Sequence, residues 1–148
     1  MLAQLDVMIT KYVELAAELK RKVPAVSAIM GNKEDVLHPG HRAFYDGVYD
    51  WVVRFAASEP GQEDLDQALE LLLFSAQRYE KTAACWYLLA IQNHGKLLIP
   101  LLEDAGRESI RQRYGAVYPK RKQLPVQKEI YQMLGGQKRK GFRFCNTD

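Results

Sequence analysis

The sequence has little cysteine and no long hydrophobic run. Cys85 and Cys145 belong to no C-x-x-C pair, so the sequence indicates neither a disulfide framework nor a cysteine zinc site. The longest unbroken apolar run, residues 83–91, is far shorter than the roughly 20 residues of a membrane-spanning helix. The first twelve residues include Asp6 and no leading positive cluster, which is not typical of a secretory signal. We therefore expect a cytoplasmic protein in a reducing compartment, without a membrane span.

Signatures of catalysis and of β-structure are also missing. No stretch alternates apolar and polar residues in the manner of a strand, and no glycine-rich phosphate loop is present. The serines at 27, 58, 75 and 109 do not stand in a nucleophile-elbow sequence. Cys85 lies in an apolar segment, where a thiol is usually inert. We therefore expect no catalytic activity and no cofactor.

Helical periodicity is what the sequence has in abundance. In residues 2–22 the apolar side chains recur every three or four positions, which places them on one helix face, and Pro24 ends the pattern. Similar stripes predict further helices over about 40–57, from about 63 onward, over about 81–98, 106–115 and 126–134. The sequence therefore predicts an all-α fold, a single-domain helical bundle or irregular array of five to six helices, in residues 1–134.

Two of these segments are apolar beyond a single face. The helix that begins near Glu63 carries Leu71 and Phe74 beside its main stripe, so we expect neighbours on both sides of it. Residues 83–91 are apolar all round, and we interpret them as the central helix of the bundle. Most of the large rings, Trp86 included, are then expected in the core, with Tyr49 and Tyr87 as exceptions. Residues 23–39 are expected to form a loop.

Charge is divided unevenly along the chain. Residues 1–105 carry 10 lysines and arginines against 15 acidic residues, a net charge of −5, whereas residues 106–148 carry 11 against 3, a net charge of +8. Residues 135–148 form a basic tail. Such an asymmetry is a hint of an anionic partner, although it also serves solubility.

The basic region supports one alternative function, nucleic-acid binding by an accessory protein. Positive side chains track phosphates, and the aromatic residues interleaved with them can stack on unpaired bases. The candidate anion-binding residues are Arg107, Arg111, Arg113, Lys120, Arg121, Lys122, Lys138, Arg139, Lys140 and Arg143.

The three histidines support a second alternative, a small metal-dependent enzyme. His38 and His41 flank a predicted loop-to-helix junction, and His94 lies on a separate helix, so the three could supply a three-ligand site with an open position. The spacing matches no recognised metal motif, and hydrogen-bonded core histidines are the simpler interpretation. Asp46 and Asp50, spaced one turn apart with Arg42 and Arg54, are interpreted as a solvated ladder of charges rather than a catalytic pair.

The leading hypothesis is a protein-interaction or self-associating module. The chain has many large rings for its size, and a surplus aromatic face is typical of an oligomer or partner interface. Small helical bundles without catalytic motifs commonly act by binding, an argument from fold class alone.

Overall fold

The computed structural model describes residues 1–22 and 39–135, and every regular element in these residues is helical. The all-α prediction is confirmed. In chain order the elements are α1 (Leu2–Lys22), α4 (Pro39–Ala57), α5 (Gln62–Arg78), α6 (Cys85–Ala90), α7 (Gln92–Gly95), the 3₁₀ helix η1 (Ile99–Leu101), α8 (Asp104–Val117), the 3₁₀ helix η2 (Lys120–Lys122) and α9 (Pro125–Leu134). The predicted loop, apart from Pro39, and residues 136–148 of the basic tail lie outside the described residues.

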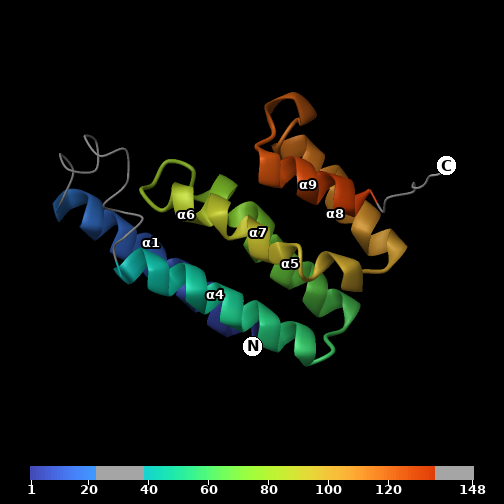
Figure 1. The fold of residues 1–148 in the computed structure, drawn as a ribbon, viewed down its shortest axis with the longest axis horizontal. Coiled ribbons are helices and arrows are strands. Elements are labelled where there is room, and N and C mark those ends of the chain that lie inside the picture. Colours follow the sequence, from blue (N-terminus) through green and yellow to red (C-terminus); the bar gives the residue numbers. More distant parts are fainter. Residues whose placement is uncertain (23–38, 136–148) are drawn as a thin grey trace.

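Helices α1 and α4 form an antiparallel pair along one side of the molecule (Figure 1). The ring of Tyr12 stacks on that of Phe44 with centroids 4.1 Å apart, and the Trp51 indole donates a 2.8 Å hydrogen bond to the carbonyl of Met1. These contacts join the middle of α1 to the start of α4, and the start of α1 to the end of α4. Each helix therefore buries the apolar stripe that the sequence predicts.

Helix α5 is the central element of the fold. It packs against α1, α6, α7 and α8, which lie on different sides of it (Figure 1). Its buried side chains are Leu65, Ala68, Leu69, Leu72, Leu73, Phe74, Ser75 and Ala76. The expectation that this helix has neighbours on both sides is therefore correct, because helices on different sides cover its wide apolar surface.

The predictions of one helix over residues 81–98, and of residues 83–91 as the central helix of the bundle, are wrong. Short helices α6 and α7 occupy this segment, and Trp86 is 66% exposed. The amides of His94, Leu97 and Leu98 bond to carbonyls three residues earlier, so the chain is wound more tightly than an α-helix. Only part of this apolar segment faces α5, while the rest remains at the surface.

Helices α8 and α9 form a hairpin on the side of α5 away from the α1–α4 pair (Figure 1). Ile110 and Tyr114 of α8 are fully buried, as are Ile130 and Leu134 of α9. Pro125 stands at the first turn of α9, where its missing N–H costs nothing. No helix among the described residues is both long and apolar enough to cross a membrane.

Candidate functional surfaces

His41 is buried at the junction of α4 with α1 and α6. Its Nδ1 lies 2.6 Å from the hydroxyl of Tyr12, with which it is hydrogen-bonded. Its ring stacks on that of Tyr87 with a centroid distance of 4.8 Å. His41 is therefore held as a packed core residue.

His94 is buried where α7 meets α4. Its Nε2 hydrogen-bonds to the carbonyl of Tyr45 at 3.2 Å, and its ring contacts those of Tyr45 and Tyr49. Burial lowers the pKa of the imidazole, because the charged form would lose its hydration, while the Tyr45 carbonyl and Asp46 act in the opposite direction. The neutral ring therefore suits this environment.

The described residues do not assemble the proposed histidine metal site. His41 and His94 are held by different aromatic partners, and His38 lies outside the described residues. Residues 1–22 and 39–135 contain no group of three or more histidine, cysteine or carboxylate side chains that could hold a metal ion. The metal-dependent enzyme stays an untested hypothesis that depends on His38.

The three arginines predicted on α8 form ion pairs within the molecule. Arg107 pairs with Asp104, and Arg111 pairs with Glu108. Arg113 reaches across to α5, where it contacts the carboxylates of Glu70 at 2.5 Å and Asp66 at 3.2 Å. Because carboxylates neutralise these guanidinium groups locally, they are poorer phosphate ligands than their sequence suggests.

The other predicted basic cluster differs from these arginines. Lys120, Arg121 and Lys122 form the exposed turn η2, and among the described residues they take part in no ion pair. Residues 138–143, which contain the remaining candidates Lys138, Arg139, Lys140 and Arg143, lie outside the description.

A buried hydrogen-bond network joins α7 to α8. The hydroxyl of Tyr114 donates to Gln92 Oε1 at 2.5 Å, and Gln92 Nε2 donates to the hydroxyl of Tyr118 at 3.3 Å. Burial raises the pKa of the Tyr114 phenol. The pKa of the nearby Cys85 thiol is also raised, by burial and then by Glu80, so the thiol stays protonated at neutral pH. Gln92, Tyr114 and Tyr118 satisfy one another's hydrogen bonds, which is a structural role.

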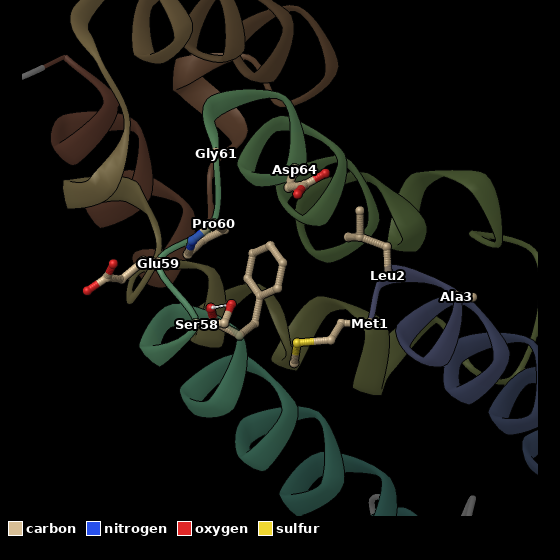
Figure 2. Close-up of a pocket in the computed structure, with 9 residues that line it drawn as sticks. Met1, Leu2, Ala3, Ser58, Glu59, Pro60, Gly61 and Asp64 are labelled. Carbon is tan, nitrogen blue, oxygen red and sulfur yellow. Dashed lines mark hydrogen bonds between the residues drawn. The ribbon is translucent and has the colours of Figure 1, made fainter.

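An open pocket of about 500 Å³ lies between the start of α1 and the turn from α4 to α5 (Figure 2). Its acidic side chains, Glu59 and Asp64, lie on different sides of it and point away from each other (Figure 2). The Ser58 hydroxyl donates to the carbonyl of Phe55 at 2.6 Å. The lining therefore contains no nucleophile paired with a base, and it offers no catalytic arrangement.

Four half-exposed apolar side chains lie along the boundary between α4 and the α7–η1 segment. They are Tyr49, Val53, Leu97 and Leu101, each between 43% and 46% exposed. We call this group the outer apolar strip. Tyr49 and Val53 are one helical turn apart on α4. Leu97 and Leu101 are also four residues apart, on a segment wound in three-residue turns.

Contacts between the two segments place these side chains along one edge. The rings of Tyr49 and His94 have centroids 5.4 Å apart, and α4 and α7 run in the same direction (Figure 1). Val53 and Leu97 therefore both lie about one turn beyond this contact. The carbonyl of Leu101 accepts a 3.1 Å hydrogen bond from the side chain of Gln62. Gln62 is the first residue of α5 and follows the end of α4 by five residues, so this bond holds Leu101 near the end of α4.

The chain matches no family model, no curated protein and no solved structure. The exposure of Tyr49 is expected from the sequence, whereas that of Val53, Leu97 and Leu101 is not, and the expectation of a buried Trp86 is wrong. The sequence does carry a sign of these exposed side chains, because α4 and residues 83–101 contain more apolar residues than one buried face can hold.

Proposed function

We propose that the protein is a helical protein-binding module whose outer apolar strip receives an amphipathic helix of a partner protein. The observation that carries the proposal is the gathering of four half-exposed apolar side chains on two neighbouring segments, Tyr49 and Val53 on α4 and Leu97 and Leu101 after α7. A helix that lies over these side chains can place its own apolar residues among them, at three- and four-residue spacing.

The surroundings of the strip favour a specific interface over scattered surface apolarity. Asp46 and Arg42 are exposed on α4 near Tyr49. Lys96, the residue before Leu97, forms an ion pair with Glu129 in which Nζ and Oε1 are 2.7 Å apart. An apolar centre with a charged rim is the usual anatomy of a protein interface.

The hypothesis can be tested by selecting displayed helical peptides of about 20 residues, about 30 Å long, against the full chain. Selected peptides are then measured by calorimetry against the double variant Val53→Asp/Leu97→Asp. Each substitution removes an apolar contact at the centre of the strip, so we expect the Kd to rise at least about 10-fold, the loss typical of one hot-spot residue.

The matched control is Val7→Asp/Leu124→Asp, which introduces the same charges at apolar residues of similar exposure outside the strip. We expect it to bind the selected peptides as the parent does, and both variants to keep the parent's Tm within a few degrees. Peptides that lose affinity for the control, or bind the strip variant unchanged, would contradict the proposed function. Sedimentation velocity of the free protein shows separately whether a second copy occupies the strip.

A further inference from the structure

The turn η2 presents three positive charges in three consecutive residues, Lys120, Arg121 and Lys122. All three side chains are exposed. The turn is held from both ends, since the amide of Lys122 bonds to the carbonyl of Pro119 at 2.8 Å and the buried Gln123 donates to the carbonyl of Tyr118 at 3.0 Å. The charges are therefore carried on a backbone fixed by internal hydrogen bonds.

Tyr118 locates this turn beside the end of α5 and the start of α6. Its hydroxyl is hydrogen-bonded to Gln92, and its ring lies 5.0 Å from that of Tyr114, which in turn contacts Phe74 of α5. Burial raises the pKa of the Tyr118 phenol, although the hydrogen bond from Gln92 acts in the opposite direction. Cys85 and Glu80 raise this pKa further by charge repulsion, which places both side chains close to the Tyr118 hydroxyl. Lys120 follows Tyr118 by only two residues.

The same end of the molecule carries further cations and an exposed ring. Arg78 and Lys81 are exposed at the end of α5 and in the turn that follows, where Glu80 is the acidic residue between them. Trp86, the residue after Cys85, is 66% exposed on α6, an unusual position for the largest apolar side chain. Positive charges and a solvent-facing indole thus lie at the same end of the molecule.

We propose that this surface binds single-stranded nucleic acid, with the η2 cations contacting phosphates and Trp86 stacking on a base. We call it the η2–Trp86 surface. The charges suit a polyanion because phosphates release condensed counterions when lysine or arginine neutralises them. The indole suits unpaired bases because every base offers a face for stacking, whereas a duplex hides those faces. This surface is separate from the outer apolar strip and does not depend on it.

The experiment uses the full chain and a labelled oligonucleotide of about 15 unpaired nucleotides, within the usual span of a single-strand site. Fluorescence anisotropy gives the affinity between about 50 and about 200 mM salt. Three phosphate contacts predict a slope of about −2 in log affinity against log salt, which is roughly a 20-fold loss over that range. Intrinsic fluorescence reports stacking directly, because Trp86 is exposed whereas Trp51, the other tryptophan, is fully buried.

Two variants separate the contributions of charge and ring. Lys120→Ala/Arg121→Ala/Lys122→Ala is expected to bring the salt slope close to zero, because each phosphate contact contributes about −0.7. Trp86→Ala is expected to lower the affinity about 10-fold, within the range for one stacked base, without changing the slope. The matched control Lys11→Ala/Arg42→Ala/Arg54→Ala removes the same charge from exposed positions on α1 and α4 and is expected to bind nearly as the parent does.

Three results would overturn the proposal. The first is the absence of binding at about 50 mM salt, where phosphate contacts are strong. The second is an equal loss of oligonucleotide affinity in the η2 triple variant and in the control variant, which would show that net charge alone drives binding. The third is tighter binding to phosphatidylglycerol vesicles than to the oligonucleotide, lost in Trp86→Ala, which would identify a membrane surface instead. Circular dichroism of each variant confirms that loss of binding is not loss of fold.

Discussion

Aromatic side chains enclose the two histidines of the described residues, and His94 is the one whose protonation the fold opposes. Its imidazole is packed against Tyr45 and Tyr49, and its Nε2–H is used by the Tyr45 carbonyl. Asp46 is the charged group that offsets the burial in part. Protonation at this position would therefore weaken the contact between α4 and α7.

The lowered pKa of His94 predicts a loss of stability in acid. The unfolded chain has the ordinary histidine pKa of about 6.5 and binds a proton more readily than the folded protein below that value. The contribution of the neutral ring to the free energy of unfolding is thus complete above about pH 6.5. It is lost as the pH falls through the lowered pKa of His94 in the folded protein. Urea titrations should show a smaller fall in unfolding free energy from pH 7 to pH 5 in His94→Gln than in the parent. Equal falls in both proteins would contradict this prediction.

At the scale of the element, Gly95 determines how closely α7 approaches α5. A Cβ at this position would lie 3.0 Å from Leu73 Cδ2 and 3.5 Å from Leu69 Cδ2. Both leucines are fully buried, so neither has free space to move into. The missing side chain therefore allows the backbone of α7 to pack directly on the central helix.

Gly95→Ala is expected to destabilise the protein by about 1–2 kcal/mol, because overpacking a filled core outweighs the better helix propensity of alanine. Gly47→Ala is the matched control, since it lies inside α4 with only Met8 Sδ near the added carbon, at 3.9 Å. It should stabilise the protein by about 0.5–1 kcal/mol through propensity alone. Thermal and urea denaturation measure both effects, and a stabilised Gly95→Ala protein would refute the close-packing argument.

At the scale of the whole molecule, stability is organised around α5. This helix touches the α1–α4 pair, the α6–α7 segment and the α8 helix, so separating any one of these leaves it covered on its other sides. The ion pairs of Arg113 with Glu70 and Asp66 join α8 to α5 at a half-exposed site, where such pairs contribute little. Apolar burial, rather than charge, therefore holds the layers together.

Native-state hydrogen exchange should find the slowest amides in the middle of α5. Opening them requires the neighbours of the helix to separate together, which approaches global unfolding. Amides of α6 and α7 should exchange faster, because these helices are short and one side of the segment faces solvent. Slowest exchange in α8 or α9 would instead show that their hairpin is the stable nucleus.

The sequence determined the helical class and most helix bounds, because a helix stripe is local. The first helix is predicted over residues 2–22 and found as Leu2–Lys22, and the last is predicted over 126–134 and found as Pro125–Leu134. Arg42, Asp46, Asp50 and Arg54 are also exposed on α4, as expected, although no ion pair forms among these four side chains. Such features depend on residues within a few turns of one another.

Tertiary structure alone decided which apolar segment became the centre and which side chains remained available for binding. Residues 83–91 are more apolar than α5, yet α5 packs against four other helices while Trp86 faces solvent. Arg113 meets Glu70 at a sequence separation of 43 residues, whereas the η2 cations meet no carboxylate among the described residues. Burial and charge pairing depend on which distant surfaces the fold brings together, and no local spacing encodes that choice.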